Sequence, residues 1–179
     1  RILEVGYENR QANSSEMDRM RGHVENSMKE GAMGIGSSLI YAPGDYASTE
    51  ELTELSKVAS DYGGMYISHL RSEGTNLLEA LEELISISRD ANIPAEIYHL
   101  KASREPNWSK LDEVIKRVEE VRGEGLKITA DIYTYNASST GLTGVIPTWV
   151  QEGGHSAWIE RMRDPEVRPR LLKDIREQL

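Results

Sequence analysis

The same pattern, an apolar run that ends in a histidine, occurs in residues 63–74, GGMYISHLRSEG, and in residues 93–103, IPAEIYHLKAS. Each stretch begins with the β-branched and aromatic residues typical of a buried strand. Each reaches a histidine where the apolar run ends, His69 in the first and His99 in the second. One such histidine is usually an ordinary half-buried residue. Two at the same point of successive units indicate a shared site.

Strands and amphipathic helices alternate through the middle of the chain with a regular spacing. His69 and His99 are 30 residues apart, and His99 and Asp131 are 32 apart. The patterns predict strands over residues 32–36, 65–68, 93–99 and 127–133. They predict helices that start near Ser15, Ser48, residue 75 and Ser109, followed by a tail of short helices, one of them opening at Pro165.

Alternation of this kind predicts an α/β fold with a parallel sheet and right-handed crossovers. The carboxyl ends of parallel strands carry the chemistry in both barrel and open-sheet enzymes. His69, His99 and Tyr133 all fall at that end of successive strands. We therefore expect them to be neighbours around one rim. Four strands amount to half a barrel.

The composition limits the classes of protein that are possible. Of the 179 residues, 38% are hydrophobic and 28% are charged, which is typical of one globular domain. The formal charge of −9 argues against a nucleic-acid partner. There is no cysteine, and no apolar run approaches the ~18 residues of a membrane span. We expect a cytoplasmic protein, and the opening at Arg1 suggests a fragment of a longer one.

Two imidazoles from adjacent strand ends, with a carboxylate nearby, commonly hold Zn²⁺ with one position open. Such a metal acidifies its bound water and polarises a carbonyl, which predicts a hydrolase of amides or esters. Asp131 could be the carboxylate on spacing alone, or it could hydrogen-bond a loop. His23, inside a predicted helix, and His155, in a glycine-rich turn, are expected to be structural.

Lys101 follows His99 by two residues, so its ammonium could meet a substrate carboxylate, with an ordinary surface lysine as the alternative. The acidic residues of the predicted helices fall opposite the apolar stripe and are expected to be solvated. They are Glu79, Glu82, Glu83, Glu119 and Glu120.

An ordered series of motifs now points to a family. It consists of GAMGIGSSLIYAPGDYASTEELTELSKVASDYGGMYISHLRSEG, EIYHLKAS, NWSK and TADIYTYNASST. The series resembles the N-acyl-D-amino-acid deacylase (D-aminoacylase) branch of the amidohydrolase superfamily, from about Gly31 to Pro165. The resemblance implies a metal-dependent (β/α)8 barrel that hydrolyses the amide bond of N-acyl-D-amino acids. This chain would supply approximately strands four to seven.

The resemblance also implies roles for individual residues. His69 and His99 match the zinc ligands at the ends of strands five and six. Lys101 matches a lysine that holds the substrate's α-carboxylate. Tyr41 in LIYAPG and Tyr133 in DIYTY match tyrosines that line the same pocket.

Several parts of the family pattern are missing from the sequence. The opening His-x-His and the bridging ligand, often a cysteine, are absent, and the general-base aspartate of strand eight is expected beyond Leu179. No catalytic residue is therefore assigned within this chain, and the resemblance makes Asp131 a weaker candidate for that role. SSLIY and YHLK also differ from the commoner family wording, which leaves the side-chain and acyl preference open. The chain alone is expected to be inactive and to bind zinc weakly or not at all.

We accordingly predict a single domain over residues 1–179, with βα units in 1–135 and a loop and helical tail in 136–179. The predicted fold is a partial (β/α)8 barrel of about four parallel units. The expected ligand is a small N-acyl-D-amino acid, with no nucleic acid or membrane partner and with the chain itself forming a homodimer. Two alternatives remain: a cyclic-amide hydrolase of the hydantoinase or dihydroorotase kind, or a non-catalytic α/β binding or assembly module.

Overall fold

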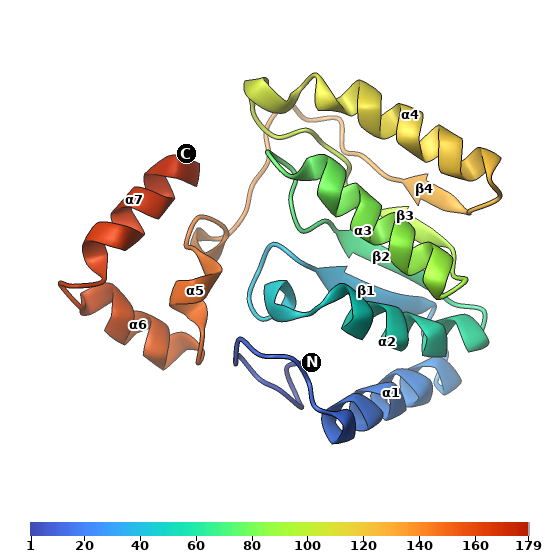
Figure 1. Cartoon of the computed structure of the whole chain (residues 1–179), viewed down its shortest axis with the longest axis horizontal. Coiled ribbons are helices and arrows are strands. Elements are labelled where there is room, and N and C mark those ends of the chain that lie inside the picture. Colours follow the sequence, from blue (N-terminus) through green and yellow to red (C-terminus); the bar gives the residue numbers. More distant parts are fainter. Residues whose placement is uncertain (179) are drawn as a thin grey trace.

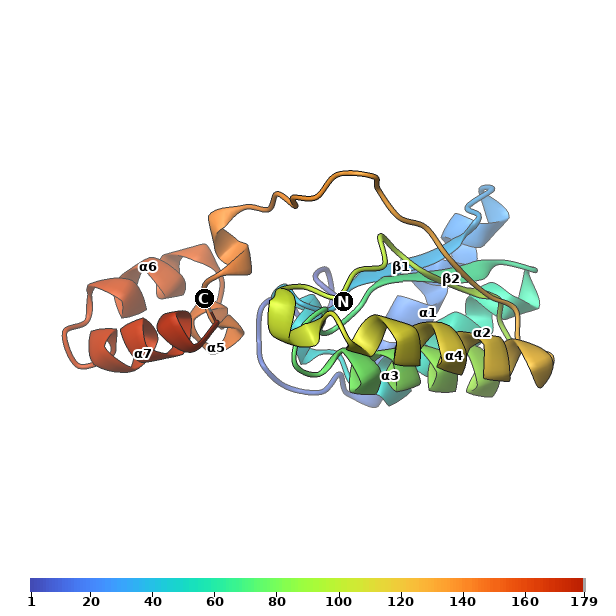
Figure 2. The same ribbon diagram turned by 90° about the horizontal axis from the view of Figure 1, so that it is seen from above.

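The computed structural model describes residues 1–178 and contains one parallel sheet with a layer of helices on one of its faces (Figures 1 and 2). The strands are β1 (Gly34–Ser38), β2 (Met65–His69), β3 (Ala95–Ile97) and β4 (Ile128–Ala130). The covering helices are α1 (Ser14–Lys29), α2 (Thr49–Asp61), α3 (Leu77–Asp90) and α4 (Lys110–Gly123). Short 3-10 turns lie at η1 (Gly44–Tyr46), η2 (Glu105–Asn107) and η3 (Leu142–Gly144).

The sheet order is β1-β2-β3-β4, and every neighbouring pair is parallel. Ser38 lies opposite His69 across the first pair, and Ser68 lies opposite Ile97 across the second. All four strands therefore end at the same rim. The predicted α/β fold of four parallel βα units is confirmed.

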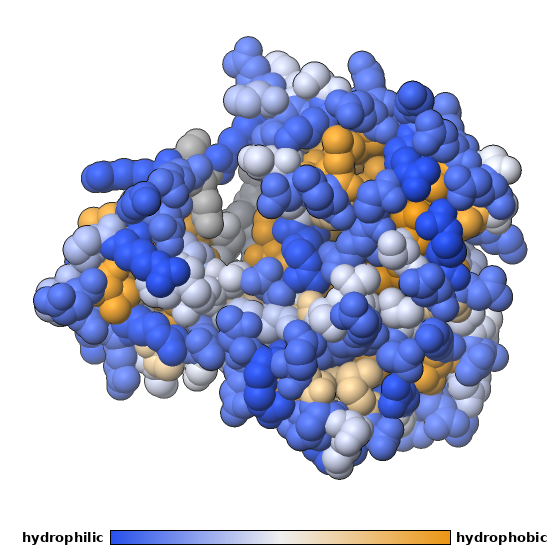
Figure 3. Space-filling model, viewed as in Figure 1, coloured by the Kyte–Doolittle hydropathy of each residue, from blue (hydrophilic) through white to orange (hydrophobic). Residues whose placement is uncertain are grey.

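The core lies between the sheet and the helices, as the apolar stripes predict. In α3, the side chains of Leu77, Leu81 and Ile85 are fully buried, and Ile97 of β3 is fully buried beneath them. Burying a side chain of this size contributes roughly 1.5–3 kcal/mol. The outward face of the helix layer is largely hydrophilic, and hydrophobic colour is confined to small patches (Figure 3).

Three helices form the tail: α5 (Thr148–Gln151), α6 (His155–Arg163) and α7 (Arg168–Gln178). They surround a small cluster of their own that includes Val150 and Leu171, and they form a lobe beside the sheet (Figure 2). Tyr46 donates from its hydroxyl to the Thr148 carbonyl at 2.5 Å, which fixes the lobe to the rim. Leu179, the last residue of the expected tail, lies outside the described residues. No described helix has the length and apolar character needed to cross a membrane.

Several element ends differ from the sequence-based predictions. β1 begins at Gly34 rather than residue 32, and β4 ends at Ala130 rather than residue 133. A Cβ at Gly34 would lie 2.0 Å from the Met65 carbonyl oxygen, so only glycine allows the strands to meet there. α3 begins at Leu77, and α7 begins three residues after Pro165.

The caps of the helices are also partly different. Ser48 caps α2 as predicted, with its hydroxyl accepting from the Glu51 amide. Ser109 has helical backbone angles and makes no side-chain cap. α1 is capped by Asn13 instead of Ser15.

The cap of α1 is a reciprocal pair of hydrogen bonds. The Asn13 side chain accepts from the Glu16 amide at 3.0 Å, and the Glu16 carboxylate accepts from the Asn13 amide at 2.8 Å. This pair satisfies two backbone donors that a helix start otherwise leaves free. The Arg10 guanidinium, with the Asn13 amide, holds the pKa of the Glu16 carboxyl at about 2.

We expect Asn13→Ala to lower the free energy of unfolding by about 1 kcal/mol, the usual cost of losing a side-chain cap. Urea unfolding followed by circular dichroism measures it. Asn26→Ala is the matched control, because Asn26 is an exposed residue inside the same helix. Equal losses in the two variants would show that the cap contributes nothing specific.

Candidate metal and substrate site at the sheet rim

The two histidines converge at the carboxyl end of the sheet. His69 is the last residue of β2, and His99 lies two residues beyond the end of β3. His69 Nδ1 is 2.8 Å from His99 Nε2, and the ring centroids are 4.4 Å apart. The two histidines are therefore neighbours at one rim of the sheet, as the sequence pattern predicts.

Lys101 and Glu73 complete a compact polar cluster with the histidines. Lys101 Nζ is 2.7 Å from His99 Nδ1 and 2.5 Å from Glu73 Oε1. The same carboxylate oxygen is 3.1 Å from His99 Nδ1 and 3.7 Å from His69 Nε2. The loop after β2 supplies Glu73, and the loop after β3 supplies Lys101.

The contacts of Lys101 assign one consistent set of proton positions in this cluster. An ammonium can only donate, so His99 Nδ1 accepts from Lys101. His99 Nε2 then carries its proton and donates to His69 Nδ1, which leaves the His69 proton on Nε2. His69 Nε2 is buried and has no hydrogen-bond partner among the described residues. Burial lowers the pKa of His69, which keeps the imidazole neutral.

This geometry fits a divalent metal ion of the kind that binds nitrogen and oxygen. One ligand atom each from His69, Glu73 and His99 lies within 4.8 Å of the other two. The unpartnered Nε2 of His69 faces the same space as the Glu73 carboxylate. A metal ion bound at this nitrogen would displace its proton, because only a deprotonated ring nitrogen can be a ligand.

Asp131 takes the second of its two predicted roles and hydrogen-bonds a loop. Its Oδ1 accepts from the His99 amide at 2.5 Å, and its carbonyl accepts from the Leu100 amide at 2.8 Å. His99 has a φ of +42°, a left-handed conformation that is uncommon outside glycine. The loop that Asp131 holds is therefore the one that aims a candidate ligand.

The two predicted tyrosines flank the cluster on either side. The Tyr41 ring centroid is 5.3 Å from that of His69, and the Tyr41 hydroxyl hydrogen-bonds Thr140 Oγ1 at 2.6 Å. The Tyr133 centroid is 6.4 Å from that of His99, and Lys101 Nζ lies 5.4 Å from it. The five site residues proposed from the sequence therefore lie close together at the carboxyl rim of the sheet. They are His69, His99, Lys101, Tyr41 and Tyr133.

A cavity of about 1180 Å³ lies beside this cluster, and neither His69 nor His99 is among its lining residues. Its walls include Glu73, Lys101 and Tyr133 on the rim and Trp149 on the tail lobe. The space is large enough for a small molecule with an acyl chain.

Sequence reasoning missed two acidic residues. Glu73 follows His69 by four residues in HLRSE, and that short spacing on a strand-end loop was the available signal. Glu83 was expected to be solvated, yet its side chain is only 11% exposed. Glu83 accepts from Arg71 at 2.8 and 2.9 Å, while Arg71 also donates to the Asp45 and Ala47 carbonyls. This arginine ties α3 to the loops at the rim.

The other two histidines lie away from the cluster. His23 Nε2 is 2.8 Å from Glu4 Oε1 on the exposed side of α1. His155 is the first residue of α6, where its ring meets the edge of Trp158. Both have the surroundings of structural residues.

The chain was compared with protein-family models, with curated proteins and with solved structures. No family model matches the chain. It is 35% identical over 133 residues to a D-aminoacylase of Alcaligenes xylosoxydans xylosoxydans, and 30% identical over 130 residues to an N-acyl-D-glutamate deacylase of the same organism. The resemblance to the N-acyl-D-amino-acid deacylases is confirmed. These matches cover 74% and 73% of this chain, which spans about 27% of the length of each relative.

Solved structures of these deacylases share the fold. A crystal structure of D-aminoacylase, described as a novel subset of amidohydrolases, aligns with a TM-score of 0.68 and 31% identity, covering 71% of this chain and 27% of that one. The N-acyl-D-glutamate deacylase of Bordetella bronchiseptica, complexed with zinc and a phosphonate inhibitor, aligns with a TM-score of 0.68 and 27% identity. That alignment covers 70% of this chain and 26% of the other. The four βα units therefore match part of these amidohydrolase structures, in agreement with the predicted partial (β/α)8 barrel.

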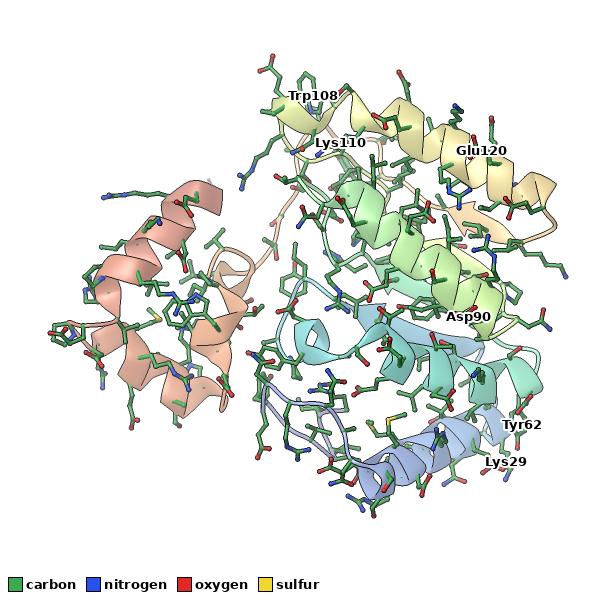
Figure 4. The ribbon with its side chains drawn as sticks, viewed as in Figure 1. Lys29, Tyr62, Asp90, Trp108, Lys110 and Glu120 are labelled. Atoms are coloured by element: carbon green, nitrogen blue, oxygen red, sulfur yellow. The ribbon has the colours of Figure 1, made fainter. Side chains whose placement is uncertain are left out.

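Asp131→Ala should lower the free energy of unfolding by about 2 kcal/mol, because it removes a charge-assisted hydrogen bond from a strained loop. Asp131→Asn retains an acceptor oxygen and should recover most of the loss. Asp90→Ala is the control. Asp90 is exposed and is the last residue of α3, at the end of that helix that lies away from Lys110 (Figure 4). Urea unfolding gives all three values. If Asp131→Ala behaves like Asp90→Ala, the loop does not depend on this carboxylate.

Proposed function

We propose that this chain forms part of a zinc-dependent amidohydrolase that cleaves the amide bond of N-acyl-D-amino acids. The observation that carries the proposal is the cluster of His69, Glu73, His99 and Lys101 at the carboxyl rim of the sheet. A solved D-aminoacylase structure is described by its binuclear metal centre, and a related deacylase was solved with zinc. Both support a metal role for the two histidines here.

The proposed reaction assigns a role to each of the site residues that the sequence predicted. His69 and His99 hold the metal, which supplies polarisation of the amide carbonyl and an activated water when bound. Lys101 binds the α-carboxylate of the substrate through its ammonium, and Tyr41 and Tyr133 shape the walls around it. We propose that the remaining ligands and the general base belong to the whole protein, and that this chain does not turn over alone.

The ammonium of Lys101 favours substrates with a free carboxylate. This feature separates a linear N-acyl amino acid from a cyclic amide of the hydantoin type, which has no such group. A screen of N-acyl-D-amino acids against hydantoins and dihydroorotate with the full-length protein separates these two activities. A non-catalytic module would hydrolyse none of them.

Changing either histidine to alanine should remove metal-dependent hydrolysis in the full-length protein. The reason is that each imidazole provides a ligand that the other rim residues cannot replace. Hydrolysis of N-acetyl-D-amino acids and bound zinc by elemental analysis are measured together. His23→Ala is the control, because His23 lies on α1 and pairs with Glu4. Full activity in His69→Ala or His99→Ala, after stripping and refilling with zinc, would refute the assignment.

Lys101→Met should raise KM for N-acyl-D-amino acids by roughly tenfold or more while kcat changes less. The ammonium meets the carboxylate in both the ground state and the transition state, so its loss weakens binding uniformly. Steady-state kinetics give both constants. Lys116→Met, on the exposed face of α4, is the matched control. An unchanged KM would remove Lys101 from the substrate pocket.

We also propose that the isolated chain forms a twofold dimer of half-barrels. β1 and β4 are edge strands with free backbone groups, and an eight-stranded barrel has no such edges. Exposed apolar residues flank both edges: Met33 is 83% exposed before β1, and Ile132 is 68% exposed after β4.

Sedimentation equilibrium at micromolar concentration should therefore give a dimer. The double variant Met33→Lys and Ile132→Lys should be monomeric, since it places like charges at the joining edges. Ile115→Lys, on the exposed side of α4, should remain dimeric. A monomeric unmodified chain would contradict the dimer.

A further inference from the structure

Glu73 lies at the centre of the rim cluster, yet the proposed reaction assigns it no part. Its side chain is only 15% exposed, and that of Lys101 is 20% exposed. The Glu73 Oε1 atom contacts Lys101 Nζ at 2.5 Å and His99 Nδ1 at 3.1 Å. Burying an unpaired charge is costly, so a carboxylate this enclosed needs a partner, and Lys101 provides it.

The two loops that carry Glu73 and Lys101 are fastened to each other. The Glu73 carbonyl accepts from the Ser103 amide at 2.7 Å. The Ser103 carbonyl in turn accepts from Asn107 Nδ2 at 2.8 Å, which continues the connection to η2. Backbone and side-chain bonds thus join the same two loops, so the Glu73 carboxylate has a fixed place relative to Lys101.

The donors of Lys101 can be counted. An ammonium has three N–H groups, and two of them are used by Glu73 Oε1 and His99 Nδ1. The third has no acceptor among the described residues. Lys101 lines the cavity, so this third donor is the one available to a ligand there.

We propose that Glu73 is the positioning residue that fixes the Lys101 ammonium, so that its free N–H meets the substrate's α-carboxylate. This rests on the proposed function, which gives Lys101 its ligand. Lysine has a long, flexible stem, and holding its end in place removes the rotamer entropy that binding would otherwise cost. Glu73 therefore acts through Lys101 and does not touch the substrate.

A competing role for Glu73 is that of a third metal ligand. In this structure Glu73 Oε1 pairs with Lys101 Nζ at 2.5 Å, although the same residue also belongs to the His69, Glu73 and His99 group that could hold a metal ion. A divalent ion on that oxygen would sit beside an ammonium, and like charges at such separation repel strongly in a half-buried site. The two roles predict different measurements.

The test uses the full-length protein, stripped of metal, and four variants: Glu73→Ala, Glu73→Gln, Lys101→Met and the exposed control Glu79→Gln. Calorimetry measures Kd for an N-acetyl-D-amino acid, for its methyl ester, and for Zn²⁺ alone. The ester lacks the carboxylate, so the ratio of the two organic Kd values reports the Lys101 contact and not general folding. Circular dichroism checks that each variant is folded.

We expect Glu73→Ala to weaken binding of the acid by about tenfold while the ester and Zn²⁺ bind as before. Glu73→Gln keeps an acceptor and should recover part of the loss, and Glu79→Gln should change nothing. Loss of Zn²⁺ affinity in Glu73→Gln would overturn the proposal in favour of a ligand role. An unchanged acid-to-ester ratio in Glu73→Ala, with a lowered ratio in Lys101→Met, would overturn it and leave the proposed function standing. No effect of Lys101→Met would overturn both.

Discussion

The parallel pairing of β2 with β3 is the constraint on which the rim depends. Their register places Ser68 opposite Ile97, so His69 ends one strand beside the start of the loop that carries His99. A parallel pair needs a long crossover, and α3 provides it with a fully buried apolar stripe. The same helix core that holds the crossover therefore sets the distance between the two imidazoles.

The rim has a structural cost that other contacts offset. His99 is held at a left-handed backbone angle, a strain on the order of 1–3 kcal/mol, and His69 Nε2 is buried without a partner. Asp131 opposes the first cost by bonding the His99 amide, and Arg71 braces the loop that follows His69. A strained backbone conformation persists only where several surrounding contacts enforce it. Such conformations are typical of functional sites.

The sequence predicts much of this arrangement because the decisive signals are local. The apolar runs before His69 and His99 and the stripe on α3 depend only on residue spacing. Glu73 and Glu83 could not be assigned in that way, because their partners come from other elements. Glu73 pairs with Lys101, 28 positions later, and Glu83 pairs with Arg71 on the opposite side of a loop. The error at the α1 cap has a smaller origin, since Asn13 and Ser15 are both good caps and Glu16 favours the residue three before it.

Charge balance connects the rim residues to the proposed substrate. With neutral imidazoles, the cluster contains one cation, Lys101, and one anion, Glu73, so it is balanced as it stands. A divalent ion held by His69 and His99 would add two positive charges next to the ammonium, and the Glu73 carboxylate alone could not offset them. A substrate carboxylate on the free N–H of Lys101 restores one negative charge at the place of greatest excess. The arrangement therefore favours an anionic ligand most strongly when the metal is present, and Glu73 keeps the ammonium in place until that ligand arrives.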